Sequence, residues 1–356
     1  MIWHRTLTDG GQQPAEVAQI LAAFLSEARK SIDIAIYDFS LSGTIEAPIH
    51  EAVTAARSRG VTVRIVYNID RSDRVPVPPP ARTDPEQLAA LGVPVKGILG
   101  VPHLMHHKYA VADGVSVFTG SANWTDDSWS REENVLITLR SDEVAASFTK
   151  DFDELWATGA VDGTGDFDAP EASVDGARVR VWFSPGKGSN IAHRIAHAIG
   201  RAKRRVRVAS PVITSGPILG TLAEVAAAGR VDLSGVYDAT QMREVNQQWR
   251  AQPTGSWKIP AFASLIERVP FSGKRSTPFA PGAVHDYMHA KITVADDVTF
   301  VGSYNLSHAG EMNAETVLEI ADPGFAQEMA RFVDAVRLRY ATPEPHVPAR
   351  ASTRKS

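Results

Sequence analysis

One polar pattern occurs twice in this chain of 356 residues, and it constrains the fold more than any other feature. Each copy reads His-x-Lys, then an aspartate after a short apolar run, and then Gly-Ser-x-Asn. The same spacing separates the two histidines and the two aspartates, which indicates a duplicated unit. We therefore expect two related halves whose motifs meet at a shared interface. The motif residues are His106, Lys108, Asp113, Gly120, Ser121 and Asn123, and then His289, Lys291, Asp296, Gly302, Ser303 and Asn305.

The segments around the motifs alternate between helical and extended patterns. Apolar residues recur at helical spacing from Pro14 and lead into an alternating strand at residues 31–39. A second helix ends at Gly60 and leads into the strand 61–67, and the second half repeats this order from Val179 onward. A strand, helix and strand of this length form a βαβ unit, which predicts a parallel or mixed sheet. We therefore predict an α/β fold of two βα-rich halves, with mixed sheets flanked by helices and a pseudo-twofold relation.

Composition suggests where the halves begin and end. The first half is predicted to span residues 1–158, closing with an amphipathic helix. Residues 159–177 are rich in Gly, Asp and Ala and are predicted to form a linker. The second half is predicted to span 178–341, and the polar tail 342–356 is predicted to be disordered.

The overall composition is typical of a globular protein, with 44% hydrophobic residues, 22% charged residues and a net charge of −4. No run of apolar residues approaches the length of a membrane span, and the first residues lack the apolar segment of a signal peptide. The absence of cysteine leaves the redox compartment open. We expect a cytoplasmic protein by default, or a secreted one if a signal peptide has been removed.

The two motifs resemble those of the phospholipase D superfamily, whose members are phosphodiesterases that include phospholipases, nucleases and transphosphatidylases. The resemblance implies one active site built from both motifs, so that a single chain can act as a monomer without an obligatory protein partner. It also implies hydrolysis of a phosphodiester substrate through a covalent phosphohistidine. By resemblance His106 is the nucleophile and His289 the acid, although the similarity of the halves leaves the reverse assignment open.

The residue types suit this reaction without a metal or other cofactor. A phosphodiester is anionic, so its cleavage needs a nucleophile, an acid for the leaving oxygen and positive charge around the phosphoryl oxygens. Histidine can fill the first two roles because its pKa lies near neutrality. Lys108 and Lys291 are expected beside the histidines, on the same face of each strand. Further contacts to the phosphate are expected from Asn123, Asn305, Ser121 and Ser303.

The motif aspartates and glycines are expected to shape the backbone. Asp113 and Asp296 each follow a buried strand at a turn, and the resemblance gives them a mainly structural role. Gly120 and Gly302 are expected to let the backbone approach the phosphate closely.

A glutamate stands ten residues beyond each motif asparagine, Glu133 in the first half and Glu315 in the second. The resemblance implies that a carboxylate near this point binds the far nitrogen of the catalytic histidine, as the aspartate does in a Ser-His-Asp triad. We assign Glu133 to His106 and Glu315 to His289. Glu132 is an alternative partner, although strand alternation would point it the other way.

His103, His106 and His107 together resemble a metal-binding cluster. Zinc sites need three or four converging ligands, and the chain has no cysteine. His107 would point away from His106 on a strand, so we interpret it as structural and predict no metal.

The segment Gln241–Arg275 combines basic and aromatic residues. This mixture suits a strand of nucleic acid, because charge follows phosphates and rings stack on bases. It also suits a phospholipid headgroup, and the aromatic residues could instead pack within the segment. The basic residues are Arg243, Arg250, Lys258, Arg268, Lys274 and Arg275, and the aromatic ones are Trp249, Trp257, Phe262 and Phe271.

The first motif region resembles most the branch of small bacterial nucleases and mitochondrial endonucleases. The sequence therefore favours a metal-independent nuclease acting on nucleic acid, although the net negative charge argues mildly against tight nonspecific binding. The alternative is a phospholipase D that releases phospholipid headgroups or transfers the phosphatidyl group. A noncatalytic phosphate-binding scaffold is a third alternative, disfavoured because both motifs are complete.

Overall fold

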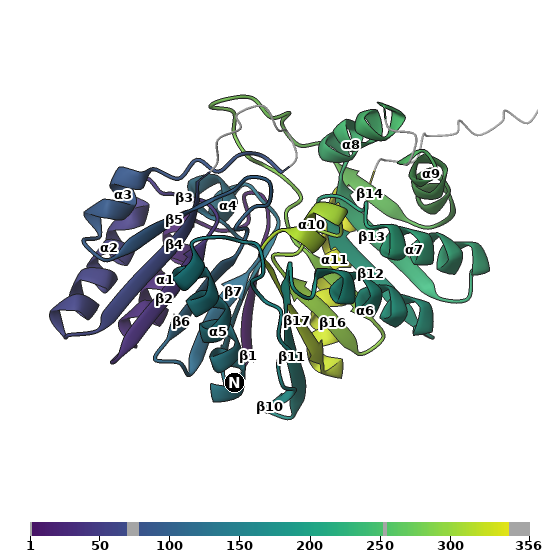
Figure 1. The fold of residues 1–356 in the computed structure, drawn as a ribbon. Coiled ribbons are helices and arrows are strands. Elements are labelled where there is room, and N and C mark those ends of the chain that lie inside the picture. The colour runs from purple at the N-terminus through teal and green to yellow at the C-terminus, as the bar shows by residue number, and fades with distance from the viewer. Residues whose placement is uncertain (1, 70–77, 252–254, 342–356) are drawn as a thin grey trace, which may run out of the picture.

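The computed structural model describes residues 2–69, 78–251 and 255–341. They form two α/β halves that lie side by side, each with a mixed sheet flanked by helices (Figure 1). The predicted duplicated α/β fold is confirmed. The tail predicted to be disordered, residues 342–356, lies outside the described residues.

The first half contains a seven-stranded sheet in the order β1-β9-β7-β6-β2-β4-β5. The pairs β2–β4 and β4–β5 are parallel, and the other neighbouring pairs are antiparallel. Its strands are β1 (Ile2–Leu7), β2 (Ser31–Ile36), β4 (Thr62–Ile69), β5 (Val95–Leu99), β6 (Lys108–Ala112), β7 (Ser116–Gly120) and β9 (Asn134–Arg140). Short β3 (Phe39–Ser40) and β8 (Trp124–Thr125) form a separate pair. The helices are α1 (Pro14–Ser26), α2 (Gly43–Ser58), α3 (Pro85–Ala90), α4 (Asp126–Ser130) and α5 (Asp142–Thr158).

The second half contains an eight-stranded sheet in the order β10-β11-β17-β16-β15-β12-β13-β14. Apart from the additional edge strand β10, this order and its strand directions repeat those of the first sheet. The strands are β10 (Ala172–Val174), β11 (Ala177–Ser184), β12 (Arg205–Ser210), β13 (Asp232–Asp238), β14 (Phe271–Lys274), β15 (Ile292–Ala295), β16 (Val298–Gly302) and β17 (Glu315–Ala321). The helices are α6 (Gly188–Arg201), α7 (Gly216–Ala228), α8 (Ala239–Ala251), α9 (Lys258–Arg268), α10 (His308–Met312) and α11 (Pro323–Arg339).

Two segments differ from their description in the sequence analysis. The segment 159–177, treated there as a linker, contains β10, which pairs with β11. The segment Gln241–Arg275 consists largely of the helices α8 and α9 and the strand β14, which adds to the sheet in parallel with β13. It is therefore part of the folded second half.

The long helices α5 and α11 each begin at a residue whose side chain caps the helix N-terminus. The side chain of Ser141 caps α5 by accepting from the N–H of Val144, and α5 ends at Gly159 in the left-handed conformation. Asp322 caps α11 in the same way, by accepting from the N–H of Phe325. Both helices contribute apolar side chains to one core cluster.

This core cluster crosses from one half to the other. It joins Phe148 and Tyr109 of the first half to Phe183, Leu318 and Val333 of the second. The rings of Phe148 and Phe183 lie 5.2 Å apart at nearly perpendicular planes. The relative position of the halves, and hence of their motifs, is fixed by apolar packing as in a domain interior. None of the described helices has the length and apolar character needed to cross a lipid bilayer.

Candidate active site

The motif histidines lie where the two halves meet, and each is anchored by backbone of the opposite half. The N–H of His106 donates to the carbonyl of Ala314 at 2.9 Å. The N–H of His289 donates to the carbonyl of Glu133 at 3.1 Å. Single β-bridges between Met105 and Ala314, and between Glu133 and Met288, accompany these bonds. The structure thus brings the two motifs together, as the duplication predicts.

His106 is held by a carboxylate of the second half. Its Nδ1 lies 2.8 Å from both carboxylate oxygens of Glu315, and both side chains are buried. Its Nε2 is buried without a hydrogen-bond partner among the described residues. A ring whose Nδ1 donates to a carboxylate presents the lone pair of Nε2, which is the form that a nucleophile requires.

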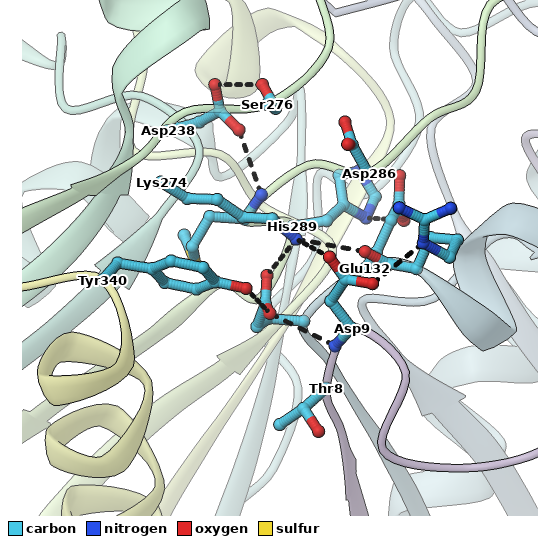
Figure 2. Close-up of polar contacts among 12 residues, drawn as sticks. Thr8, Asp9, Glu132, Asp238, Lys274, Ser276, Asp286, His289 and Tyr340 are labelled. Atoms are coloured by element: carbon cyan, nitrogen blue, oxygen red, sulfur yellow. Dashed lines mark hydrogen bonds and ion pairs between the residues drawn. The ribbon is translucent and has the colours of Figure 1, made fainter.

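His289 has different partners, of which Figure 2 labels Glu132. Its Nδ1 lies 3.1 Å from the amide oxygen of Asn134 and 3.4 Å from a carboxylate oxygen of Glu132. The amide of Asn134 donates to the same Glu132 oxygen at 3.1 Å, and Ser128 donates to it at 2.8 Å. The two histidines therefore sit in unequal surroundings, one against a carboxylate directly and the other against an amide backed by a carboxylate.

The predicted pairing of Glu133 with His106 and of Glu315 with His289 is wrong. Partners are exchanged between the halves, and the carboxylate of Glu133 is bound by Lys274, Tyr340 and the N–H of Asp9 rather than by a histidine ring. Two equivalent hydrogen bonds show how the halves align. The hydroxyl of Ser121 accepts from the backbone N–H of Val135, and the hydroxyl of Ser303 accepts from the backbone N–H of Thr316. Asn134, not Glu133, therefore corresponds to Glu315, because the first half has one more residue between its short helix and the strand.

Glu133 instead forms a buried network between elements that are distant in sequence, and Figure 2 labels its partners Lys274, Tyr340 and Asp9. Its carboxylate accepts from Lys274 at 2.8 Å, from the hydroxyl of Tyr340 at 2.5 Å and from the N–H of Asp9 at 3.2 Å. Lys274 also donates to the carbonyl of Arg131 at 3.0 Å. The network holds the backbone of Glu133 itself, and the carbonyl of this residue accepts from the N–H of His289. Glu133 therefore has a positioning role in place of the predicted catalytic one.

The two motif lysines occupy equivalent positions. Each ammonium donates to the carbonyl of its own histidine at 2.6 Å, Lys108 to His106 and Lys291 to His289. Burial lowers the pKa of Lys108 to about 7. Burial, and then the charge of Lys108, hold the pKa of Lys291 well below its usual value. An anion bound beside these lysines would offset the cost of burying their charge and favour their protonated forms.

Burial and the two lysines also shift the pKa values of the motif histidines and of Glu315. Burial, and then the charges of the two lysines, hold the pKa values of His106 and His289 well below their usual range. Burial raises the pKa of Glu315 to about 8, and the lysines partly offset this shift. A bound phosphodiester anion would counter the lysine charge and so favour protonation of a histidine.

The asparagines and serines of the motifs differ in whether their side chains already have hydrogen-bond partners within the protein. Asn123 and Asn305 each carry a buried side-chain oxygen without a hydrogen-bond partner among the described residues. Ser121 is engaged, because its hydroxyl donates to the Asn134 amide oxygen at 2.7 Å. Ser303 accepts from the backbone N–H of Thr316 at 2.9 Å. The serines, predicted to bind substrate, therefore support the residues that hold the histidines, whereas the asparagines remain candidates for phosphate contact through their amide N–H groups, since only these can donate to a phosphate oxygen.

The motif glycines and aspartates hold the backbone on which the site is built. A Cβ on Gly120 or Gly302 would lie 2.1 Å from a carbonyl oxygen of the adjacent strand, Val135 or Thr316. The predicted close approach is therefore to a neighbouring strand. Asp113 accepts from the N–H groups of residues 29–31, and Asp296 accepts from those of residues 203–205. These bonds support the structural role expected of both aspartates.

Among the described residues, the histidines outside the motifs do not complete a metal site. His107 is buried between Thr316, at 2.8 Å from its Nδ1, and Asp151, at 3.1 Å from its Nε2. Within residues 2–69, 78–251 and 255–341, no three His, Cys, Asp or Glu side chains are grouped so that they could hold a metal ion.

Comparison with known protein families identifies the chain. The family model described as "Cardiolipin synthase, PLD-like domain" matches residues 21–156 and 195–336, one match in each half. The chain belongs to the phospholipase D-like family. The superfamily assignment made from the two motifs is therefore confirmed.

The curated relatives below match between 32% and 39% of this chain. A human protein named mitochondrial cardiolipin hydrolase is 32% identical over 144 residues, covering 39% of this chain and 50% of that protein. Its namesake from Xenopus tropicalis is 31% identical over 147 residues, covering 38% of this chain and 59% of that protein. Phospholipase D Z of Dictyostelium discoideum is 35% identical over 128 residues, covering 32% and 29%. The chain spans about half the length of the cardiolipin hydrolases that it matches.

Solved structures extend the likeness of fold over nearly the whole chain. Phosphatidylserine synthase of Haemophilus influenzae Rd KW20 aligns with a TM-score of 0.64 and 14% identity, covering 94% of this chain and 86% of that one. Polyphosphate kinase of Porphyromonas gingivalis aligns with a TM-score of 0.58 and 12% identity, covering 98% and 53%. At these identities the likeness concerns the fold alone.

Sequence reasoning missed one residue of the site and left another open. Asn134 was not considered, because an amide carries no obvious sign of a histidine partner. Glu132 was named only as an alternative partner of His106, whereas it lies against His289. That Asn134 corresponds to Glu315 could have been suspected from the extra residue between Asn123 and the strand that begins at Asn134, since it shifts the alignment of the halves by one.

Proposed function

We propose that this protein is a phosphodiesterase that cleaves the headgroup ester of a phospholipid through a covalent phosphohistidine. The observation that carries the proposal is the meeting of His106 and His289 from two halves, each anchored by the other half and accompanied by a buried lysine. Nucleophile, acid and positive charge are the three requirements of metal-free phosphodiester cleavage.

The surroundings of the histidines support unequal roles. We assign the attack to Nε2 of His106, because Glu315 holds Nδ1 and Nε2 has no partner in the described structure. Nε2 bonds to phosphorus while the bond from phosphorus to the leaving oxygen breaks, and His289 gives its proton to that oxygen. Lys108 and Lys291 offset the charge on the phosphoryl oxygens during this step.

The second step releases the product. His289, now neutral, accepts a proton from water as the water oxygen bonds to phosphorus and the phosphorus–nitrogen bond to His106 breaks. An alcohol in place of water would give a transferred ester by the same sequence. The second step returns both histidines to their initial protonation states, so the cycle balances without a metal, an oxidant or another cofactor.

A phospholipid is favoured over nucleic acid by two observations. The matching family model and the curated relatives carry the names of lipid enzymes. The segment 241–275 also provides less of a stacking surface than its sequence suggests, because Trp249 and Phe262 are buried in the core of the second half. Lys274 is buried against Glu133, and Trp257 remains exposed at 46%.

The test is a parallel assay with EDTA present, on anionic phospholipid vesicles and on single-stranded DNA and RNA, with wild-type protein, His106→Ala and His289→Ala. Release of lipid headgroup by the wild-type protein alone is expected. Cleavage of nucleic acid without headgroup release would replace the lipid substrate by the nuclease alternative. Loss of activity in EDTA would contradict the metal-free mechanism. Full activity in either histidine variant would contradict the shared site.

A further inference from the structure

The ring of Tyr37 contacts two motif residues at once. This tyrosine directly follows β2 and is only 2% exposed. The ammonium of Lys108 lies over its face, 4.7 Å from the ring centroid. The ring of His106 lies 4.6 Å away, with an angle of 64° between the two planes, which is an edge-to-face arrangement. One aromatic side chain therefore contacts both the proposed nucleophile and the cation beside it.

Hydrogen bonds hold this ring from both ends. The backbone N–H of Tyr37 donates to the carbonyl of His107 at 2.8 Å. Its hydroxyl donates to the carbonyl of Pro79 at 2.9 Å. The next residue, Asp38, accepts from the N–H of Arg82 at 2.8 Å, so the segment that receives the hydroxyl is itself anchored. The ring is thus fixed in place against the motif.

The ammonium of Lys108 needs such support because it is buried among other charged groups. These groups are Lys291, Glu315, Asp38 and Glu132, with the imidazoles of His106 and His289. Burial lowers the pKa of Lys108, and the three carboxylates act in the other direction. The face of an aromatic ring attracts a cation, and the attraction is stronger where water is excluded. The ring of Tyr37 therefore favours the charged form of the lysine.

The second half has no equivalent of this ring. In each half an alanine pairs with the residue that follows the motif lysine, and the position two residues beyond that alanine is Tyr37 in the first half and Pro211 in the second. The pairs are Ala35 with Tyr109 and Ala209 with Ile292. Aromatic support from this position is therefore confined to the half that carries the proposed nucleophile.

We propose that Tyr37 is a positioning residue of the active site, whose ring keeps the Lys108 ammonium charged and fixes the plane of His106. The inference rests on the proposed function, because it gives the ring a role in the turnover of a phosphodiester. One ammonium hydrogen bonds to the carbonyl of His106 and the ring face occupies a second direction, so the third hydrogen is left for a phosphoryl oxygen. The lysine then stays charged to a higher pH than burial alone would allow.

The pH dependence of turnover tests this role. Bis(p-nitrophenyl) phosphate remains a monoanion between about pH 5 and 9, so changes in its kcat/KM report on the enzyme. Tyr37→Leu should move the fall of kcat/KM at high pH about one pH unit lower, because the charged form of Lys108 loses the attraction of the ring. It should also lower the plateau below that fall by about two- to tenfold, because His106 loses its edge contact.

Two matched variants isolate the ring. Tyr37→Phe retains the ring and loses only the bond to Pro79, so the midpoint of the fall should stay where it is in the wild-type protein. Phe39→Leu removes a buried ring that packs on Trp124, and it should also leave the midpoint unchanged.

A further substitution separates the charge distribution of the ring from its volume, and it serves even if Tyr37→Leu does not fold. Pentafluorophenylalanine at position 37 has nearly the shape of phenylalanine but an inverted ring quadrupole, so it should lower the midpoint at least as far as leucine does. A folded fluorinated variant with the same midpoint as Tyr37→Phe would overturn the inference.

Sulfate binding, measured by calorimetry without turnover, separates this inference from the proposed function. Sulfate is a dianion throughout this pH range, and its affinity should fall as Lys108 loses its proton, at a lower pH in the leucine and fluorinated variants. These shifts in binding without cleavage of the diester would retain the role of Tyr37 and reject the phosphodiesterase. Cleavage with midpoints that do not depend on the ring, or sulfate binding that does not depend on pH, would reject the role of Tyr37 alone.

Discussion

The buried ion pair between Lys274 and Glu133 offers a stringent test of how the halves are held together. Glu133 is 0% exposed and Lys274 is 3% exposed, and their charged atoms lie 2.8 Å apart. The pair joins β14 of the second half to the residue that precedes β9 of the first. Removing one partner of such a pair leaves a buried charge uncompensated, which typically costs about 3–5 kcal/mol.

We expect Lys274→Met to lower the free energy of unfolding by about 3 kcal/mol, the lower end of that range. The lower value follows because Tyr340 and the N–H of Asp9 continue to donate to the Glu133 carboxylate. Methionine fills a similar volume, so the loss reports on charge rather than on a cavity.

The matched double variant Lys274→Met/Glu133→Gln removes both charges and should recover most of the lost stability, because a neutral amide is far less costly to bury than an unpaired carboxylate. Urea unfolding followed by tryptophan fluorescence measures the four corners of this double-mutant cycle, and Lys203→Met serves as the surface control. A loss below about 1 kcal/mol for Lys274→Met, or a double variant no more stable than the single one, would refute the reasoning.

Three further predictions concern the site itself. Glu315→Gln should lower kcat/KM by about 10²- to 10⁴-fold, because the amide no longer fixes the tautomer of His106; a steady-state assay with unchanged circular dichroism checks this. Asp113→Ala should lower the free energy of unfolding by about 1–3 kcal/mol, because it removes hydrogen bonds to the backbone at a turn. The turnover of the folded protein should stay unchanged. Urea unfolding measures the first effect, and an active-site titration measures the second. Because burial lowers the pKa of Lys108 to about 7, the lysine is charged below that pH and neutral above it, so kcat/KM for an anionic ester should fall as pH rises through 7; a flat profile between pH 6 and 9 would contradict this.

The sequence predicts those parts of the site that depend on local patterns. Repetition of the motifs is sufficient to place His106 and His289 at one interface, because duplicated units bring equivalent segments together. The histidine partners were beyond this reasoning. Strand alternation says which face a side chain occupies, but not which element of the other half lies opposite, and so Glu315 was assigned to the wrong histidine. The one-residue difference before Asn134 also conceals that Asn134 corresponds to Glu315.

Much of the fold follows from apolar periodicity, and the exceptions have physical reasons. The pattern of β6 is predictable because all five of its residues are buried. β1 has no such signal, because its residues are mostly half-buried at the sheet edge. In the segment 241–275, the mixture of basic and aromatic residues suggests a binding loop. Trp249 and Phe262 are instead core residues of amphipathic helices, and periodicity is the better guide there than composition.

The differences between the halves are themselves informative, because duplication supplies two copies of every position. Positions that each half needs for its own backbone remain the same: the turn aspartates Asp113 and Asp296, and the glycines that lie against a neighbouring carbonyl. The motif histidines and lysines are also the same in both halves, whereas the partners of the histidines have diverged, as Asn134 has from Glu315. A symmetric pair of histidines could exchange roles, whereas attack and proton donation require different protonation states at the same moment. Divergence at the histidine partners is thus what a division of roles between the two halves requires.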